Sequence, residues 1–342
     1  MSSSTSKKRP KSRSNSRANS RSASRSNSRA SSPAPGTEFK ASDIARALSK
    51  SRRRLSHRIV GEEGNPLMVF LAGFPDSETS AFDALIRHFS SNYKVLSCSL
   101  PGMGESKEAR DSKEVGWGFK FSEICTMLDD LIRENVGSKN EKIILVGHDW
   151  GSYIAAIYEN LHPHRVSKII LYDVAMFKDA KSKDRGVKDV AITLIYQGWW
   201  AFSFFLSKIY TPLGNIAFIL YFALLKFFPI LFCFICPTKK GDRMPRNVKE
   251  VTVSMTWPYY SLFRHVLFDG AMVPKLPSCP ILYIYGKNKN IMFHNCLDEL
   301  LNREDCVVRG LLCGHWVMVE KSNLCIDIME EYLLPDKYLQ ND

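Results

Sequence analysis

Lys142-Ile-Ile-Leu-Val-Gly-His-Asp-Trp-Gly-Ser152 is the stretch of sequence that decides the fold. It begins as a β-branched, apolar run of strand type and continues into a helical pattern, SYIAAIYENL. Between the two, Gly147 and Gly151 stand two residues on either side of Asp149. This spacing is typical of a nucleophile elbow, in which glycines permit a sharp turn from strand to helix. Such a turn presents Asp149 at a helix N-terminus, where backbone N–H groups stabilise negative charge.

A carboxylate at this position indicates a particular chemistry. It attacks an sp³ carbon and forms an alkyl-enzyme ester that water must then cleave. The plain structural alternative is a helix-capping aspartate, which does not explain both flanking glycines. Ester cleavage needs a general base, and His315 in Cys313-Gly314-His315-Trp316 follows the last apolar run of the chain. The sequence therefore predicts Asp149 as nucleophile and His315 as base.

Seven short apolar runs alternate with amphipathic stretches after residue 56. The expected strands are His57–Val60, Leu67–Ala72, Val95–Leu100, Lys142–Val146, Lys168–Tyr172, Ile281–Tyr285 and Val307–Leu312. Alternation of this kind predicts an α/β fold with a mostly parallel central sheet flanked by helices. Residues 175–275 interrupt the alternation and are expected to form a helical cap, inserted between core segments 57–174 and 276–342.

The cap holds the most apolar part of the chain, Gly198–Pro237. Within it, Ile216–Cys236 has 21 residues and one charge, which is long enough to span a membrane. A single span would leave the strands before and after it on opposite sides of the bilayer, so they could not join one sheet. We therefore expect a membrane-associated cap that enters one leaflet or lies in the interface, with a buried wall of a lipophilic tunnel and a true span as alternatives.

Residues 1–56 form a separate, basic tail. They contain 15 Lys and Arg against 2 Asp and Glu, and the first 32 residues include 14 serines. Such a composition predicts a disordered arm, which phosphorylation of the serines would convert from positive towards negative. The tail suits an anionic membrane surface. The rest of the chain has a net charge of −1, which excludes a nucleic-acid surface over the whole body.

Nine cysteines, an odd number, lie mostly in apolar surroundings, and the chain starts without a cleavable secretory signal. This usage favours an intracellular, reducing compartment. The one close pair, Cys233 and Cys236, lacks a second pair or a nearby histidine that would complete a zinc site. We expect neither a metal ion nor an organic cofactor.

Residues 57–342 resemble α/β-hydrolase fold proteins of the epoxide hydrolase and haloalkane dehalogenase group. The motifs that carry the resemblance, in the family's order, are Gly73-Phe74-Pro75, Pro101-Gly102-Met103-Gly104-Glu105-Ser106, Gly147-His148-Asp149-Trp150-Gly151 and Gly314-His315-Trp316. The resemblance implies that Asp149 is the nucleophile and His315 the base. It also implies an oxyanion hole made by the backbone N–H groups of Phe74 and Trp150, which fits the tetrahedral intermediate of ester hydrolysis.

The sequence departs from the family pattern at two positions. The family usually has a histidine before the oxyanion-loop glycine, where this chain has Ala72. A catalytic acid is common three residues after the glycine that ends the strand at 281–285, but that residue is Lys289, which cannot orient a histidinium. Asp173, 24 residues after Asp149, resembles the acid of some haloalkane dehalogenases. The alternative is that Asp173 is a structural aspartate that follows a strand and has no catalytic role.

The cap offers candidates for contact with the leaving group. Epoxide hydrolases of this family polarise the ring oxygen with two cap tyrosines, whereas dehalogenases hold halide with indole or amide N–H groups. Tyr196 and either Tyr259 or Tyr260 resemble the tyrosine positions. Thirteen tyrosines make chance placement easy, and ordinary packing is the alternative.

Together these features predict a hydrolase that opens a lipophilic epoxide through an Asp149 ester, with Asp173 aligning His315. Two alternatives stay open. The first is a haloalkane dehalogenase-like hydrolase, with Trp150 as a halide donor. The second, motivated by Ala72 and Lys289, is a catalytically silent protein that binds a membrane or a partner.

Overall fold

The computed structural model of the chain describes residues 54–105, 112–138, 141–181, 186–227, 246, 248–265, 268, 273–289 and 291–334. The basic tail up to residue 53 lies outside the described residues, as do Cys233 and Cys236. The apolar stretch 216–236 is described only as far as residue 227. The predictions that concern these parts are therefore untested.

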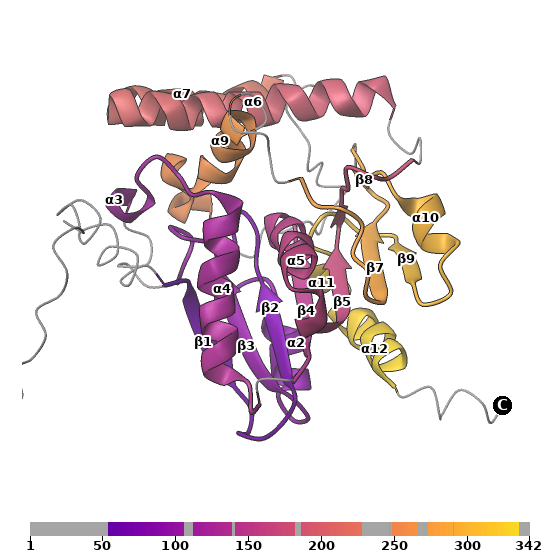
Figure 1. Cartoon of the computed structure of the whole chain (residues 1–342). Coiled ribbons are helices and arrows are strands. Elements are labelled where there is room, and N and C mark those ends of the chain that lie inside the picture. The colour runs from indigo at the N-terminus through magenta and orange to yellow at the C-terminus, as the bar shows by residue number, and fades with distance from the viewer. Residues whose placement is uncertain are drawn as a thin grey trace, which may run out of the picture. The chain divides into compact units, whose positions relative to one another are not determined.

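A seven-stranded sheet in the order β1-β3-β2-β4-β5-β7-β9 forms the centre of the fold (Figure 1). Its strands are β1 (Ser56–Val60), β2 (Leu67–Leu71), β3 (Lys94–Ser99), β4 (Ile143–His148), β5 (Val166–Tyr172), β7 (Ile281–Gly286) and β9 (Val307–Leu311). All neighbours pair in parallel except β1, which is antiparallel to β3. The prediction of an α/β fold with a mostly parallel sheet is confirmed.

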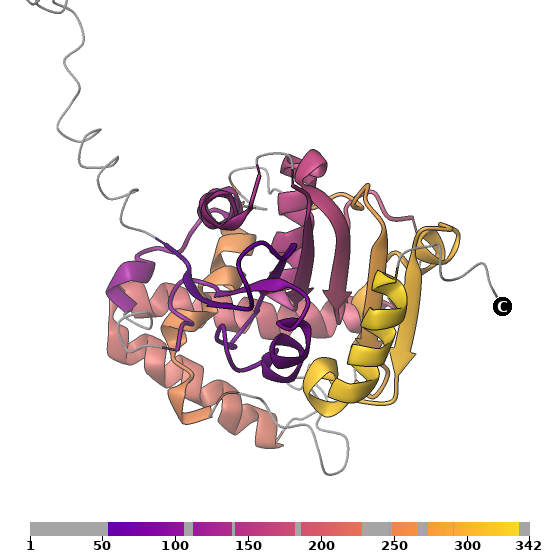
Figure 2. The ribbon, with the colours of Figure 1, turned by 90° about the horizontal axis from the view of Figure 1, so that it is seen from below.

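Helices cover both faces of this sheet, as the view from below shows (Figure 2). In the part of the chain that the structure describes, the helices are α2 (Asp83–Phe89), α3 (Ser112–Val115), α4 (Phe121–Asn135), α5 (Trp150–Leu161), α6 (Val187–Ile209), α7 (Thr211–Phe227), α9 (Trp257–Arg264), α10 (Leu297–Leu301), α11 (Val317–Glu320) and α12 (Ser322–Leu333), with short 3₁₀ turns at Pro163–Arg165, Val248–Glu250 and Val253–Thr256. One apolar core contains α4 and α5, and the other contains α2, α11 and α12.

Strand β2 explains why the sheet must be covered twice. All five of its side chains are buried and apolar. Because neighbouring side chains of a strand point to opposite faces, Val69 enters the core with α4 and α5, while Phe70 enters the core with α2 and α12. Helix α4 meets the sheet through a stripe of helical spacing that includes Ile124 and Leu128.

A second, two-stranded sheet fixes the chain beyond β5 and β7. Strand β6 (Val174–Ala175) pairs in parallel with β8 (Phe293–His294). The side chain of Asn295 then binds the backbone of Phe177 twice, through Phe177 N to Oδ1 at 2.9 Å and through Nδ2 to Phe177 O at 2.8 Å. The segment that follows β5 is therefore held against the segment that follows β7 by β6 and by Phe177.

Helices α6, α7 and α9 lie together at one end of the sheet (Figure 1). Trp200 of α6, Tyr221 of α7 and Tyr259 of α9 are buried in the same core as α4 and α5. The indole N–H of Trp199 donates to the carbonyl of Ala217 at 2.9 Å and joins α6 to α7. These contacts make a helical layer over the ends of the strands.

The outward side of α6 and α7 is apolar. Val187, Ile209, Ile216 and Ile219 are 88 %, 64 %, 62 % and 65 % exposed. Within the described part of the chain, α6 is the one helix long and apolar enough to cross a membrane, and 44 % of its most apolar window is buried inside the protein. Strands β5 and β7, which precede and follow the cap, are neighbours in one sheet. A single crossing by α6 would separate them.

Candidate active site

The turn between β4 and α5 holds Asp149 in an uncommon backbone conformation, with φ 53° and ψ −122°. A non-glycine residue with positive φ is held there only when its surroundings demand it. The surroundings here are close backbone contacts. A Cβ on Gly147 would collide with the backbone of Ser152, and one on Gly151 would collide with the carbonyl of Leu71. The two glycines thus let the elbow pack tightly against β2 and the start of α5.

Two backbone N–H groups lie at the carboxylate of Asp149. Phe74 N donates to Oδ2 at 2.9 Å, and the N–H of Trp150 lies close enough to oppose the rise of the carboxyl pKa. The loop that carries Phe74 comes this close because Gly73 has no Cβ, which would meet Asp149 and the N–H of Trp150. Oδ2 therefore occupies a place prepared for negative charge. Oδ1 faces His315, whose Nε2 lies 3.9 Å away, too far for a direct hydrogen bond.

Burial raises the pKa of Asp149 above its ordinary value. The imidazoles of His315 and His148 and the N–H groups of Trp150 and Phe74 oppose this rise without cancelling it. Removal from water disfavours the charged form, so the same carboxylate is a stronger base and nucleophile than one in solvent. The side chain keeps a 16 % exposed fraction, which leaves it accessible from the cavity above it.

His315 lies directly beneath this carboxylate and is fixed by Asp173. The Nδ1 atom of His315 bonds to Oδ2 of Asp173, and both side chains are buried. Asp173 follows β5 with a positive φ of 64°. Its Oδ1 accepts the backbone N–H of Gly286, at the end of β7, at 2.9 Å. Since Nδ1 is held by a carboxylate, Nε2 is the nitrogen directed at Asp149.

Lys289 completes the surroundings of Asp173. Its Nζ lies 2.6 Å from Oδ1 and 2.7 Å from Oδ2, and its side chain is fully buried. Burial by itself would raise the pKa of Asp173, but Lys289 and His315 outweigh it and hold this pKa below the ordinary value. Asp173 is therefore an ionised acceptor at neutral pH. The sequence alone made Lys289 an argument against a catalytic acid, whereas in the structure its ammonium group contacts Asp173 from the loop that follows β7.

A second Asp–His pair lies behind the first. The Nδ1 of the buried His148 is 3.5 Å from Oδ2 of Asp76, which also accepts the indole N–H of Trp316 at 2.9 Å. The other nitrogen, Nε2, is 3.2 Å from the carbonyl of His315, to which it can only donate. Burial lowers the pKa of His148, but the nearby carboxylates, Asp76 first among them, outweigh it, so the net shift is upward. The His148 and His315 rings are 4.5 Å apart.

An apolar cavity of about 460 Å³ opens above Asp149. Tyr196 of α6 and Tyr259 of α9 line it together with Trp150. Tyr260 does not line it, because its ring packs beside Trp117, Phe204 and Phe205. Of the three tyrosines that the sequence proposed, the structure thus brings two to the carboxylate and leaves one outside.

The two cavity tyrosines differ in their polar contacts. Burial, followed by the charge of Asp149, raises the pKa of Tyr259 well above its ordinary value, so this phenol stays protonated and can donate. The hydroxyl of Tyr196 accepts the amide N–H of Gln197 at 3.0 Å. The indole N–H of Trp150 is buried close to the Tyr259 hydroxyl but makes no hydrogen bond of normal geometry with a described residue.

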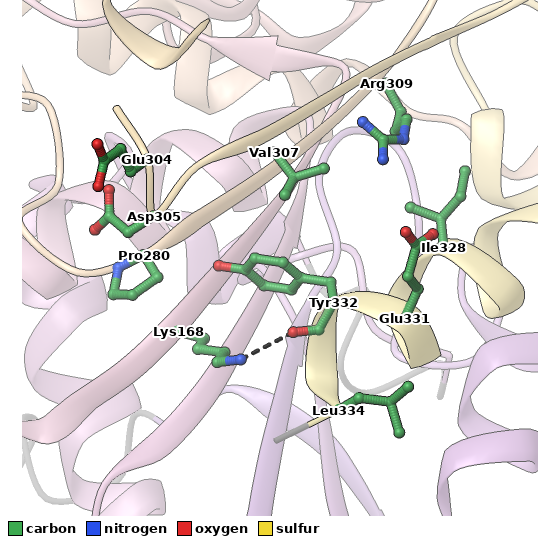
Figure 3. Close-up of a pocket in the computed structure, with 10 residues that line it drawn as sticks. All are labelled: Lys168, Pro280, Glu304, Asp305, Val307, Arg309, Ile328, Glu331, Tyr332 and Leu334. Carbon is green, nitrogen blue, oxygen red and sulfur yellow. Dashed lines mark hydrogen bonds between the residues drawn. The ribbon is translucent and has the colours of Figure 1, made fainter. Parts of the chain in front are cut away.

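Another cavity, of about 430 Å³, lies at the opposite ends of the strands (Figure 3). Lys168 of β5 and Val307 of β9 line it, and Lys168 Nζ donates to the carbonyl of Tyr332 at 2.8 Å. In parallel sheets, ligands bind at the carboxyl ends of strands. The cavity over Asp149 is at those ends, and the one in Figure 3 is not. Among the described residues, no group of three or more His, Cys, Asp or Glu side chains is arranged to hold a metal ion.

Comparison with known proteins agrees with the fold. A family model described as alpha/beta hydrolase fold matches residues 66–225. The chain is 32 % identical over 124 residues to Epoxide hydrolase 4 of Mus musculus, which is 36 % of this chain and 32 % of that protein. It is 32 % identical over 111 residues to Epoxide hydrolase 3 of Xenopus tropicalis, covering 32 % and 28 % of the two chains. The matches thus span about a third of the length of these relatives.

Solved structures extend the likeness over most of the chain. A Bacillus megaterium epoxide hydrolase in complex with an inhibitor superposes with a TM-score of 0.55 and 17 % identity, covering 82 % of this chain and 96 % of that one. At this identity the likeness concerns the fold. The chain therefore has the α/β-hydrolase fold, and its matched segment is similar in sequence to epoxide hydrolases.

Sequence reasoning did not anticipate the Asp76–His148 pair or the contact of Lys289 with Asp173. Asp76 follows the Gly73-Phe74-Pro75 motif directly, and His148 precedes the nucleophile, so their closeness to the site was the available signal. For Lys289 the signal was a cation at the strand end where the family places an acid. Its partner comes from β5, and only the pairing of β5 with β7 brings the two together.

Proposed function

We propose that this protein is a hydrolase that opens lipophilic epoxides through an ester on Asp149. The observation that carries the proposal is the carboxylate at the elbow, which accepts from Phe74 N, lies beside Trp150 N and faces a histidine fixed by Asp173. A carboxylate nucleophile, an oxyanion hole and an oriented base are the parts that ester formation and ester hydrolysis require.

In the first step, Oδ1 of Asp149 attacks an epoxide carbon, and the bond from that carbon to the ring oxygen breaks. Oδ1 is the attacking atom because Oδ2 is already bound by Phe74 N. The ring oxygen leaves as an alkoxide and takes the proton of Tyr259, which stays protonated beside the charged Asp149. Tyr196 lines the same cavity and supplies a second hydroxyl.

In the second step, His315 Nε2 takes a proton from water, and the hydroxide adds to the carbonyl carbon of the ester. The negative charge develops on Oδ2, where the N–H groups of Phe74 and Trp150 receive it. Collapse of the tetrahedral intermediate breaks the bond from the carbonyl carbon to Oδ1. The alkoxide takes the proton from His315 and leaves as a vicinal diol. The proton that remains on the Asp149 carboxyl group passes to the Tyr259 phenolate, which restores both the carboxylate and the phenol.

Trapping the ester tests this mechanism. His315→Gln removes the base, so an epoxide should alkylate Asp149 without subsequent release. After exposure to a panel of hydrophobic epoxides, intact-mass analysis should show one adduct equal to the full mass of the epoxide, on the peptide that contains Asp149. The matched control, His315→Gln with Asp149→Asn, should carry no adduct. A folded protein without an adduct, together with no turnover by the wild-type protein, would refute the proposal.

One observation favours a second candidate, the haloalkane dehalogenase-like reaction. The buried indole N–H of Trp150 lies at the cavity without a hydrogen bond of normal geometry to a described residue, so it is available to a halide. Asp173 also stands where some dehalogenases of the family place their acid. The same trapping experiment with haloalkanes separates the two reactions, because an alkyl ester forms with loss of halide, and the halide appears in solution.

We also propose that the cap and the basic tail bring the protein to an anionic membrane. Support comes from the exposed apolar side chains of α6 and α7, such as Phe202 and Ile219, and from the 15 Lys and Arg residues of the tail. Exposed apolar surface of this extent is typical of membrane or protein contacts, and clustered basic residues attract anionic lipids. Thr193 and Leu194 of α6 line the cavity over Asp149, so the cap joins the outer face to the site.

Flotation with vesicles tests the membrane proposal. The chain should float with phosphatidylserine-containing vesicles and less with pure phosphatidylcholine. The double variant Phe202→Glu, Ile219→Glu should reduce flotation at least tenfold, since each change would place a charge in the apolar layer of the membrane. Leu301→Glu on α10, which is 67 % exposed, is the matched control and should float as the wild type does. Equal flotation of both variants would contradict a role of the cap.

Truncation distinguishes a hydrolase from a catalytically silent protein that only binds a membrane or a partner. Deletion of residues 1–53 leaves β1, which starts at Ser56, intact. If the protein acts only by binding membranes, this deletion should abolish its localisation to the membrane. If it is a hydrolase, turnover of a soluble epoxide should persist while vesicle binding falls.

A further inference from the structure

Lys289 is a buried cation at the centre of the candidate active site. Its side chain is fully buried, its Nζ contacts both oxygens of Asp173, and it lies 5.3 Å from the ring of Phe293. The same two oxygens bind His315 and Gly286 N. One carboxylate therefore joins a lysine from the loop after β7 to a histidine from the loop after β9.

Stability does not account for this arrangement. Removing an ammonium group from water is costly, and replacing a buried ion pair by apolar side chains is often neutral or stabilising. Neither Lys289 nor Asp173 has exposed side-chain surface, so solvent screens neither charge. A buried pair in direct contact with a histidine of the site points to the electrostatics of that histidine.

Three carboxylates surround the two imidazoles of the site. Asp149 faces Nε2 of His315, Asp173 faces its Nδ1, and Asp76 lies beside His148. Each carboxylate favours a proton on the nearest imidazole. His148 gains such a proton readily, since the carboxylate of Asp76, 3.5 Å from its Nδ1, raises its pKa. His315, by contrast, must be without its extra proton to act as a base.

We propose that Lys289 is a positioning residue that holds Asp173 against His315 and supplies the positive charge that keeps His315 neutral when it must accept a proton. The inference rests on the proposed hydrolase function. Without Lys289, the uncompensated charge of Asp173 would hold a proton on His315 to a higher pH. With Lys289, the carboxylate keeps its orienting hydrogen bond while its charge is balanced.

Removing the charge of Lys289 tests the inference. Lys289→Met preserves the length of the side chain and leaves Asp173 unbalanced. The rate of ester hydrolysis, measured in single turnovers, should be plotted against pH. The acid limb of this profile, where the rate falls, should move to higher pH by about one to two units, the usual effect of one nearby charge. Lys289→Arg keeps the charge and should restore the limb to within about half a unit, even where the rate itself falls.

A second readout does not depend on turnover. The ring of His315 in histidine-labelled protein can be titrated by NMR and assigned with His315→Gln. In Lys289→Met its titration should move in the same direction as the acid limb. An unchanged titration and an unchanged limb, whatever the loss of rate, would mean that Lys289 only supports the fold and would overturn the inference.

Asp173→Asn provides the test should Lys289→Met fail to fold. In Asp173→Asn alone, the lysine charge stays near His315 and should move its titration to lower pH. In the double variant Asp173→Asn, Lys289→Met both charges are absent, and the titration should return upward by about one to two units. If the two proteins titrate at the same pH, Lys289 exerts no charge effect on His315 and the inference is wrong.

The outcomes also distinguish this inference from the function on which it rests. Failure to trap an adduct on Asp149, with a shifted NMR titration, would remove the proposed reaction and leave the charge coupling in place. A trapped adduct with an unshifted titration would keep the reaction and remove the role of Lys289.

Discussion

Replacing Asp173 by Asn should destabilise the folded protein by several kcal/mol, independently of any catalytic activity. Asp173 accepts two contacts from Lys289, one from Gly286 N and one from His315, and it is completely buried. Asparagine is close in size, so packing is preserved. The substitution removes the charge that balances a fully buried lysine, and its amide group presents an N–H towards one of the donors.

The expected magnitude follows from the burial of both partners. Breaking a buried ion pair by removing one member costs about 3–5 kcal/mol, because the other charge is left without compensation. For a folded body of this size, that corresponds to a fall in Tm of roughly 6–15 °C. Restoring the balance with Lys289→Met in the same chain should recover about half or more of the loss, since the double variant carries no unpaired buried charge.

The pH dependence gives a second check. The pKa of Asp173 is lowered in the folded protein, so its stabilising effect is present above the ordinary carboxyl pKa of about 3.9 and is lost as the pH falls through the lowered folded value. The difference between wild type and Asp173→Asn should therefore be full at pH 7. It should shrink as the pH is taken below about 4.

Urea unfolding followed by tryptophan fluorescence at several pH values measures these differences. Asp327→Asn, on the exposed side of α12, is the matched control and should change the free energy of unfolding by less than about 0.5 kcal/mol. A loss below about 1 kcal/mol for Asp173→Asn at pH 7, or a loss that does not shrink in acid, would refute the interpretation of Asp173 and Lys289 as a buried, ionised pair.

Three further predictions concern the elbow, the cap and the second Asp–His pair. Gly151→Ala should lower the free energy of unfolding by more than about 2 kcal/mol in urea melts, because its Cβ would collide with the carbonyl of Leu71. Tyr259→Phe should slow ester formation from an epoxide about 10–100-fold in rapid-quench assays, whereas Tyr260→Phe, outside the cavity, should stay within about twofold. The stability advantage of wild type over His148→Gln should be full below about pH 6.5 and fall as the pH rises through the raised pKa of His148, as urea midpoints across pH 5–9 would record.

The apolar runs of the chain were sufficient to predict its sheet. Each expected strand appears within a few residues of its predicted bounds. Inner strands such as β2 and β3 are buried on both faces and therefore need continuous apolar sequence. The elbow could also be predicted from the sequence, because two glycines at fixed spacing reflect two close backbone contacts that no other residue permits. These features depend on local sequence and on burial, which a sequence records directly.

The sequence could not predict which side chains of the cap point into the cavity. Tyr259 and Tyr260 are neighbours with the same chemistry, and either matched the expected position. Successive residues on a helix point about 100° apart, so only the placement of α9 against α6 decides which of them reaches the cavity. The packing puts Tyr259 beside Trp150 and Tyr260 against Phe204.

The sequence by itself determined the α/β architecture, the carboxylate at the elbow and the histidine after the last strand, because each is encoded in residues adjacent along the chain. Only the tertiary structure decided how Asp173 and Lys289 act together. They are 116 residues apart and come from the ends of β5 and β7, which pair in the sheet. Whether a lysine opposes or supports an acid depends on the distance between them in space, and the order of residues does not contain that distance.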